Sequence, residues 1–320
     1  METRLLGRTG LRVSALGMGT WPLAGALTLA GRPFGYGESA PGVAEAALET
    51  ALDSGVTLFD TADFYGLGRA ERLLAQRVAK DPRALIVTKA GNVPDNAVGV
   101  MTDVSRPHLL ASVRRSLKRL GRERVEVFLL HVLPEGDVAW DEALDTLTEM
   151  KAAGLIAHGG VSVAHRFDDV LPRLSDPRIE VVEVYYNLFF NRYRGAFSQA
   201  CAHHGVGVIG ASPLGRGLLS SSVTMDRRFD EGDVRSTWNA GGAQFQDDLA
   251  RRDRVAAAVA GFGVSLSAAA LAFVLAEPTI ATVIPGMRTS AQVADNVADI
   301  AAACGRDGLL AAMSAALDGG

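Results

Sequence analysis

The stretch LFDTADFYG, residues 58–66, begins as an apolar run and ends in polar residues. An apolar stretch that stops at polar side chains is typical of the end of a buried strand, where the chain turns out toward solvent. Asp60, Asp63 and Tyr65 follow one another within six residues at this point. The stretch therefore predicts a strand whose end carries a polar cluster at a rim of the fold.

The same arrangement recurs along the whole chain. Short apolar runs are followed by polar or glycine-rich residues and then by segments of helical period. The runs span 14–19, 56–60, 84–90, 125–131, 156–162, 181–187, 206–212 and 281–285. The helix candidates span 42–54, 69–79, 106–120, 140–153, 167–174, 195–204, 247–277 and 290–303. Strands that alternate with helices favour parallel strands joined by crossover helices.

Eight such units in about 300 residues predict an α/β fold, a closed (β/α)8 TIM barrel. An open doubly wound sheet is the alternative on the pattern alone. Ahead of the first unit, two short apolar segments flank Gly7 and Gly10. They predict an N-terminal β-hairpin that closes the barrel floor. We expect residues 1–320 to form one domain.

Composition argues against several classes of partner. The chain has 32 Lys and Arg against 36 Asp and Glu, a formal charge of −4, and no dense basic block, which disfavours nucleic acid. No apolar run reaches the roughly 18 residues of a membrane helix, and no secretory signal pattern precedes the first strand. The two cysteines, Cys201 and Cys304, have neither paired nor metal-binding spacing. We therefore expect a cytoplasmic protein without a metal, nucleic acid or membrane partner.

In a barrel, the carboxyl ends of the strands share one mouth, where barrel enzymes carry their active sites. Asp60, Lys89 and His131 end the second, third and fourth apolar runs, or nearly so, and Tyr65 follows the second run in its loop. Structural roles are the alternative: Asp60 as a turn cap, Lys89 as a rim charge, His131 as a core histidine. Four titratable side chains of four types at one mouth favour a catalytic site.

At this point the chain resembles the aldo-keto reductase superfamily. The matching stretches are LGRTGLRVSALGMGTW (6–21), DTADFYG (60–66), TKAG (88–91), LLH (129–131), GVS (160–162), YNLFFNR (186–192), SPLGRGLL (212–219) and VIPGMR (283–288). Each is weak alone, but their order and spacing are specific. The resemblance implies a barrel oxidoreductase that reduces an aldehyde or ketone reversibly, using NADPH, with NADH as the alternative. Its substrate would be a small-molecule carbonyl or alcohol.

The resemblance assigns a catalytic tetrad to Asp60, Tyr65, Lys89 and His131. Hydride delivery to a carbonyl carbon builds negative charge on the oxygen, which must be protonated or stabilised as it forms. Tyr65 would be the general acid, and the Lys89 ammonium would lower the pKa of its phenol. Asp60 would hold Lys89 by an ion pair, and His131 would orient the carbonyl.

The resemblance also implies where the cofactor binds. Ser162 would contact the carboxamide, and residues 212–217 would wrap the pyrophosphate through the backbone amides of Leu214 and Gly217. Arg288 would grip a 2′-phosphate, which favours NADPH over NADH. The expected cofactor contacts are Gly19, Thr20, Trp21, Ser162, Glu183, Ser212, Pro213, Leu214, Arg216, Gly217, Ile284, Gly286, Arg288, Gln292 and Asn296.

Three positions depart from the family pattern. Val163, Glu183 and Ala211 stand where Asn, Gln and an aromatic residue are usual. An ionised Glu183 close to the ring would attract the cationic, oxidised nicotinamide, whereas a protonated Glu183 would only replace the glutamine. The departures leave two other functions open. One is a redox-neutral isomerase or dehydratase that retains its nicotinamide cofactor, and the other is a non-catalytic, nucleotide-sensing subunit.

Overall fold

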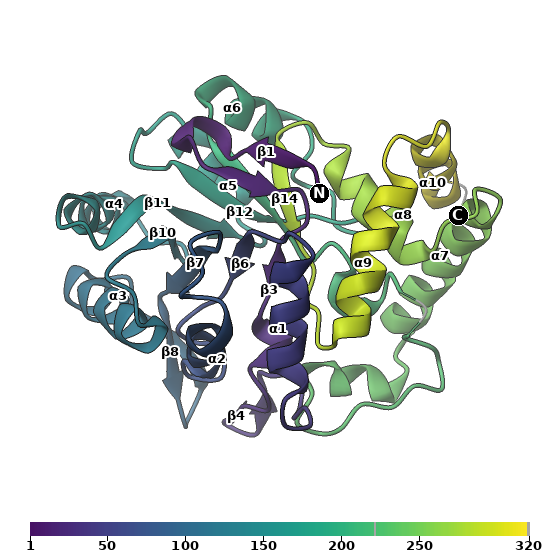
Figure 1. The fold of residues 1–320 in the computed structure, drawn as a ribbon, viewed down its shortest axis with the longest axis horizontal. Coiled ribbons are helices and arrows are strands. Elements are labelled where there is room, and N and C mark those ends of the chain that lie inside the picture. Colours follow the sequence, from purple (N-terminus) through teal and green to yellow (C-terminus); the bar gives the residue numbers. More distant parts are fainter. Residues whose placement is uncertain (221, 319–320) are drawn as a thin grey trace.

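The computed structural model describes residues 1–220 and 222–318, and eight parallel strands form its centre (Figure 1). They are β3 (Met18–Gly19), β6 (Leu58–Asp60), β7 (Leu85–Ala90), β10 (Val125–Leu130), β11 (Ile156–Val163), β12 (Val181–Tyr185), β13 (Gly207–Ala211) and β14 (Ile280–Ile284). They pair in this order, and parallel bridges from Leu16 to Val283 and from Gly19 to Gly286 join the first strand to the last. The predicted (β/α)8 barrel is confirmed, and the open doubly wound sheet is excluded.

Helices surround this barrel and cover its outer face (Figure 1). The α-helices are α1 (Val43–Asp53), α2 (Arg69–Arg77), α3 (Arg106–Leu120), α4 (Asp137–Ala152), α5 (Phe167–Val170), α6 (Ala196–His204), α7 (Ala243–Ala260), α8 (Leu266–Leu275), α9 (Ser290–Ala303) and α10 (Leu309–Asp318). The 3₁₀ turns are η1 (Gly7–Thr9), η2 (Trp21–Leu23), η3 (Leu171–Arg173), η4 (Gly215–Gly217) and η5 (Val234–Ala240).

The single helix predicted over 247–277 is wrong. Two helices, α7 and α8, occupy this part of the chain, and residues 261–265 separate them. Gly263 takes a φ of 65°, a left-handed conformation that glycine adopts without strain. The Ser265 side chain then accepts from the amide of Ala268 and caps the new helix. The break follows from these local signals, which the apolar run of α8 obscured.

The barrel floor is closed by the N-terminal hairpin, as predicted. Strands β1 (Thr3–Leu5) and β2 (Arg12–Ser14) pair antiparallel. Leu6 and Val13 are fully buried among the inward-facing side chains of the barrel, which include Leu129 and Ile209. A Cβ on Gly7 would lie 2.3 Å from the amide nitrogen of Gly207. A glycine therefore lets the hairpin turn lie directly against the start of β13.

Two further hairpins were not predicted. Strands β4 (Thr28–Leu29) and β5 (Arg32–Pro33) lie between β3 and α1, and β8 (Asn92–Asp95) and β9 (Gly99–Thr102) lie between β7 and α3. Figure 1 shows β4 and β8 projecting from the same side of the barrel. Because both hairpins follow the carboxyl ends of barrel strands, they extend the walls of the mouth.

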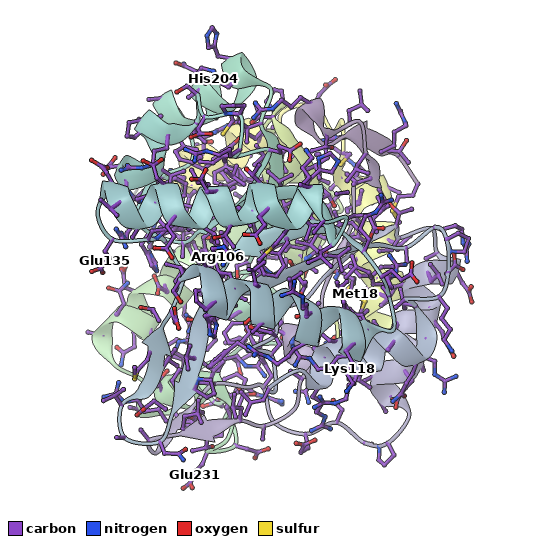
Figure 2. The ribbon with its side chains drawn as sticks, turned by 90° about the vertical axis from the view of Figure 1, so that its left-hand side faces the viewer. Met18, Arg106, Lys118, Glu135, His204 and Glu231 are labelled. Carbon is purple, nitrogen blue, oxygen red and sulfur yellow. The ribbon has the colours of Figure 1, made fainter. Side chains whose placement is uncertain are left out.

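Charged side chains lie around the outside, as the labelled Arg106, Lys118 and Glu135 show, whereas Met18 is fully buried (Figure 2). Across residues 1–220 and 222–318, no helix combines the length and the apolar character needed to cross a membrane.

Candidate active site

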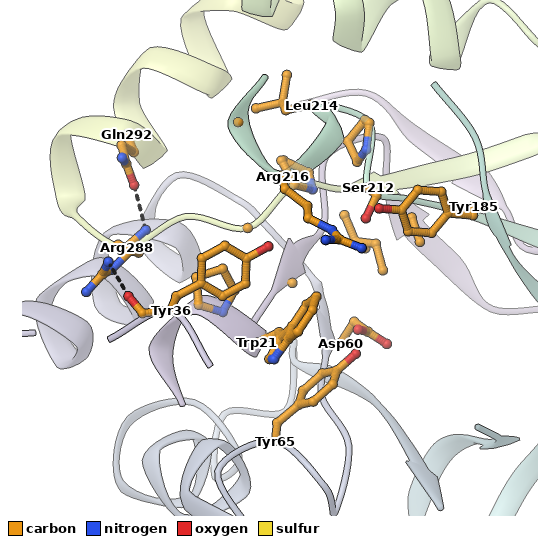
Figure 3. Close-up of a pocket in the computed structure, with 18 of the residues that line it drawn as sticks. Trp21, Tyr36, Asp60, Tyr65, Tyr185, Ser212, Leu214, Arg216, Arg288 and Gln292 are labelled. Atoms are coloured by element: carbon orange, nitrogen blue, oxygen red, sulfur yellow. Dashed lines mark hydrogen bonds between the residues drawn. The ribbon is translucent and has the colours of Figure 1, made fainter. Parts of the chain in front are cut away.

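A pocket of about 970 Å³ opens at the carboxyl ends of the barrel strands. This size and position are typical of small-molecule sites in barrels. All the predicted site residues line it except Thr20, which is buried beside it, and Lys89, which lies beneath its surface. Figure 3 shows Trp21, Asp60 and Tyr65 together, with Arg288 and Gln292 away from them toward α9. The pocket is therefore elongated, with chemically different ends.

Lys89 stands at the centre of the first end. Its side chain is fully buried, and Nζ lies 2.5 Å from Asp60 Oδ2 and 3.1 Å from Glu183 Oε2. Nζ also donates to the carbonyl of Thr61 at 3.2 Å. Burial opposes the charge, but the carboxylates of Asp60 and Glu183 outweigh it and raise the pKa of Lys89. The lysine is therefore a buried ammonium between two acidic side chains.

Both acidic partners of Lys89 are buried as well. Asp60 is 2 % exposed and Glu183 is 6 % exposed. Burial and the neighbouring Glu183 carboxylate raise the pKa of Asp60 well above its usual range, against the opposing effect of Lys89. On the other side, Glu183 Oε1 accepts from Ser162 Oγ at 3.2 Å. Ser162 and Glu183 face each other in the register of β11 and β12, so neighbouring strands fix this contact.

Tyr65 lies over this charged centre. Its ring stacks on Trp21, with centroids 5.9 Å apart, and Lys89 Nζ lies 5.3 Å from its centroid. The sequence predicted that Lys89 lowers the pKa of the phenol. Lys89 does act in this direction, but burial has the larger effect and the pKa of Tyr65 is raised. The phenol is therefore protonated near neutrality.

His131 meets Tyr65 edge-on, with ring centroids 5.6 Å apart. Its amide donates to the carbonyl of Ala90 at 2.7 Å, which extends the pairing of β7 and β10 past the last strand residue. Burial and then the Lys89 charge lower the pKa of His131 to about 3. Its Nδ1 has no hydrogen-bond partner in the described part of the chain. A neutral imidazole thus faces the pocket and can donate only from one nitrogen.

The loop after β13 has the backbone shape of an anion cradle. Ser212 and Arg216 take φ values of 51° and 58°, and Gly215 and Gly217 take 52° and 93°. A left-handed backbone conformation is strained at a residue other than glycine, and such residues are common in ligand-binding loops. Turns of this kind form concave nests of backbone N–H groups that bind anions. The amide of Gly217 itself donates to Leu214 O at 2.9 Å, so the loop already uses this predicted phosphate donor.

Arg288 lies at the other end of the pocket, beside α9. Its guanidinium donates to the carbonyls of Tyr36 and Glu38, both at 2.9 Å, and to Ser39 Oγ at 3.0 Å. Its backbone amide donates to Gln292 Oε1 at 2.7 Å. Within residues 1–220 and 222–318 it forms no ion pair with an acidic side chain. The predicted phosphate ligand therefore also ties the loop over residues 36–39 to the start of α9.

Several pocket residues were not singled out from the sequence. They are Phe34, Tyr36, Asn92, Val100, Tyr185, Arg235, Asp295 and Asp299. The loop that contains η5 reaches the opposite wall, where the amide of Val234 donates to Gly35 O at 2.7 Å and Arg235 stacks over the Tyr36 ring at 4.9 Å. Sequence signals place these loops at the mouth, but their contacts with each other are long-range.

The three residues that depart from the family pattern lie in different places relative to the pocket. Val163 is buried in the outer core and does not line the pocket. Ala211 does line it, on the last residue of β13. Glu183 lines the pocket and also contacts a predicted catalytic residue, since its Oε2 lies 3.1 Å from Lys89 Nζ.

Comparison with known proteins agrees with this geometry. A family model described as the aldo/keto reductase family matches residues 15–303. The chain belongs to this family. It is an oxidoreductase enzyme, and as an aldo/keto reductase it acts on carbonyl or alcohol groups with a nicotinamide cofactor.

Three similar proteins span nearly the whole aldo/keto reductase chain. The D-threo-aldose 1-dehydrogenase of a Pseudomonas species is 30 % identical over 315 residues, covering 87 % of this chain and 92 % of its own. The pyridoxal 4-dehydrogenase of Microbacterium luteolum is 26 % identical over 334 residues, covering 92 % of each chain. The structure of a glycerol dehydrogenase from Gluconobacter oxydans superposes with a TM-score of 0.81 at 25 % identity, covering 98 % of this chain and 94 % of that one.

The pocket fits a nicotinamide dinucleotide. Its elongated volume, the left-handed loop at 212–217 and the cation Arg288 provide places for a ring, a pyrophosphate and an adenosine end. Ser162 and Glu183, which line the pocket beside the predicted tetrad, present polar atoms suited to a carboxamide.

Proposed function

We propose that this aldo/keto reductase reduces an aldehyde or ketone with NADPH, reversibly, and that Asp60, Tyr65, Lys89 and His131 carry out the chemistry. One observation carries the proposal: the buried Lys89 Nζ, which lies 2.5 Å from Asp60 and 3.1 Å from Glu183, is 5.3 Å from the centre of the Tyr65 ring. Buried charges destabilise the folded protein unless they are fully paired. We therefore attribute this cluster to catalysis and not to packing.

Each residue has a distinct task. When bound, the nicotinamide exchanges hydride with the carbonyl carbon. Tyr65 donates its proton to the carbonyl oxygen as negative charge develops there, and Lys89 stabilises the phenolate that remains. His131, neutral at working pH, orients the carbonyl by a hydrogen bond. Asp60 fixes the position of Lys89 through the 2.5 Å ion pair. In alcohol oxidation the same proton returns to Tyr65.

Arg288 supports NADPH as the cofactor. Neutral oxygen atoms hold its guanidinium, so its charge is available to a 2′-phosphate. NADH is the alternative, and Asp295 and Asp299 favour it, because both line the pocket. Carboxylates accept hydrogen bonds from ribose hydroxyls and repel a phosphate.

The similar proteins support a small polar substrate. Their names specify a pyridoxal, an aldose and glycerol as substrates of those proteins, and all three are dehydrogenases. We therefore infer a small-molecule carbonyl or alcohol substrate and include the oxidative direction among the assays.

The test is a panel of aldehydes, ketones and alcohols with each of the four cofactor forms, followed at 340 nm and by product analysis. Cofactor conversion equal to product formation supports the proposal. Product without net cofactor conversion would instead support a redox-neutral isomerase or dehydratase. Failure of all four cofactor forms to bind would refute the proposal.

A further inference from the structure

Glu183 gives the active site a second carboxylate. It lies in β12, opposite Ser162 on one side and Ile209 on the other, and its side chain lines the pocket. Strands β10 and β11 separate β12 from β7 in the sheet order, so Glu183 reaches Lys89 across the inside of the barrel. One ammonium thus faces two carboxylates, which leaves the group with a formal excess of one negative charge when both are ionised.

Holding Lys89 does not require this second charge. The ammonium has three N–H donors, and Asp60 Oδ2 and Thr61 O already accept from Nζ at 2.5 and 3.2 Å. An uncharged amide at position 183 could accept the third hydrogen bond. A buried carboxylate is also expensive to desolvate. We therefore attribute the carboxylate at position 183 to an interaction with a ligand in the pocket, and not to holding Lys89 in place.

We propose that Glu183 discriminates between the redox states of the cofactor, its carboxylate favouring the cationic oxidised nicotinamide over the neutral reduced one. The inference rests on the proposed function, because it places the nicotinamide end beside Ser162 and Tyr65. Ser162 Oγ donates to Oε1 at 3.2 Å and Lys89 Nζ lies 3.1 Å from Oε2, so neighbours on both oxygens hold the carboxylate at the pocket wall. Charge fixed in advance in a partly desolvated site acts more strongly than charge in water.

The experiment compares dissociation constants of the oxidised and reduced forms for wild type, Glu183→Gln and Glu183→Met, using fluorescence and calorimetric titration at constant ionic strength. We expect both variants to bind the oxidised form about tenfold more weakly, and the reduced form within about twofold of wild type. Binding is measured without substrate, so loss of turnover does not affect the result. Two neutral side chains of similar length guard against failure of one variant to fold.

Glu180→Gln is the matched control. Glu180 precedes the first residue of β12, three residues before Glu183, and its carboxylate pairs with Lys151 at 2.8 Å. It lies at the opposite end of the strand, so the ratio of the two dissociation constants should not change.

Equal weakening of both redox forms in the Glu183 variants would show that the side chain only shapes the pocket, and would overturn the inference. Variants that bind both redox forms as tightly as wild type does would overturn it too, since the side chain would then play no part in distinguishing the two forms. Neither result would affect the proposed function, provided that wild type binds the cofactor. Absence of all binding by wild type would refute both proposals.

Discussion

Replacing Lys89 by methionine removes the ammonium that lies between the buried carboxyl groups of Asp60 and Glu183, and it keeps a similar side-chain length. Unit charges at 2.5 and 3.1 Å attract by roughly 5–7 kcal/mol per pair at an effective dielectric of about 20, and desolvation offsets much of this. Breaking a buried pair by removing one partner typically costs about 3–5 kcal/mol. We expect the free energy of unfolding of Lys89→Met to fall by this amount at pH 8.

The loss should depend on pH in a defined direction. The pKa of Asp60 is raised in the folded enzyme, so its ionised form costs stability, and this cost grows as pH rises through the raised value. Without Lys89 the pKa of Asp60 rises further. As pH falls, protonation of Asp60 removes the unpaired buried charge from the variant. The difference in free energy of unfolding between wild type and Lys89→Met should therefore be smaller at pH 5.5 than at pH 8.

Urea denaturation at both pH values measures this prediction, with m-values compared to confirm the same unfolding transition. The double variant Lys89→Met with Glu183→Gln removes one of the two unpaired charges and should recover about 1–3 kcal/mol at pH 8. A loss below about 1 kcal/mol, or one that does not change with pH and is not relieved in the double variant, would refute the charged, paired state of Lys89.

Three further variants address other parts of the site. Tyr65→Phe should lower kcat by about 10²- to 10⁴-fold in steady-state assays and leave cofactor dissociation constants within about twofold, and near-normal turnover would remove Tyr65 as the acid. Arg288→Ala should weaken NADPH about tenfold more than NADH in fluorescence titrations, whereas equal weakening would show that Arg288 acts only by tying down residues 36–39. Burial raises the pKa of Asp63 to about 7, so its ionisation should cost wild type about 1–2 kcal/mol of unfolding free energy between pH 6 and 8.5. Asp63→Asn should lack this component in urea titrations, and an unchanged pH dependence would contradict the raised pKa.

The fold could be predicted because its signals are local and repeated. Each barrel strand is an apolar run that stops at polar residues, as at 58–60 and 85–90, and parallel pairing then brings those ends to one rim. Asp60, Lys89 and His131 reach the mouth for this reason alone. The resemblance to a family added their roles.

The hairpin of β8 and β9 was missed although its turn is encoded nearby. The Asp95 carboxylate accepts from the amides of Ala97 and Val98 at 2.7 and 2.8 Å, and Gly99 takes a φ of 94°. Such a turn is a recognisable hairpin signal. The flanking strands are short and half-exposed, so they lack the apolar pattern that marked the barrel strands.

Other features could not be predicted from local signals at all. The contact of Arg288 with Tyr36 joins residues 252 positions apart. Glu183 reaches Lys89 across the barrel interior, between strands that are not neighbours in the sheet. Burial raises the pKa of Tyr65 more than Lys89 lowers it, and the extent of burial cannot be read from a residue pattern. These contacts depend on the closure of the barrel and on how its loops fold over the mouth.

The two ends of the pocket are therefore stabilised in different ways, and this should separate their effects on function. The end around Lys89, where we propose that the reaction takes place, is fixed by strand pairing, since β6, β7, β11 and β12 carry Asp60, Lys89, Ser162 and Glu183 in a fixed register. The end around Arg288, where we propose that the adenosine binds, is fixed by side-chain contacts between loops. Rigid elements preserve catalytic geometry, whereas loops change readily without loss of the fold. A substitution of Arg288 that changes the preference between NADPH and NADH should therefore leave the proposed redox-state preference of Glu183 intact, because the two residues share no contact and no supporting element.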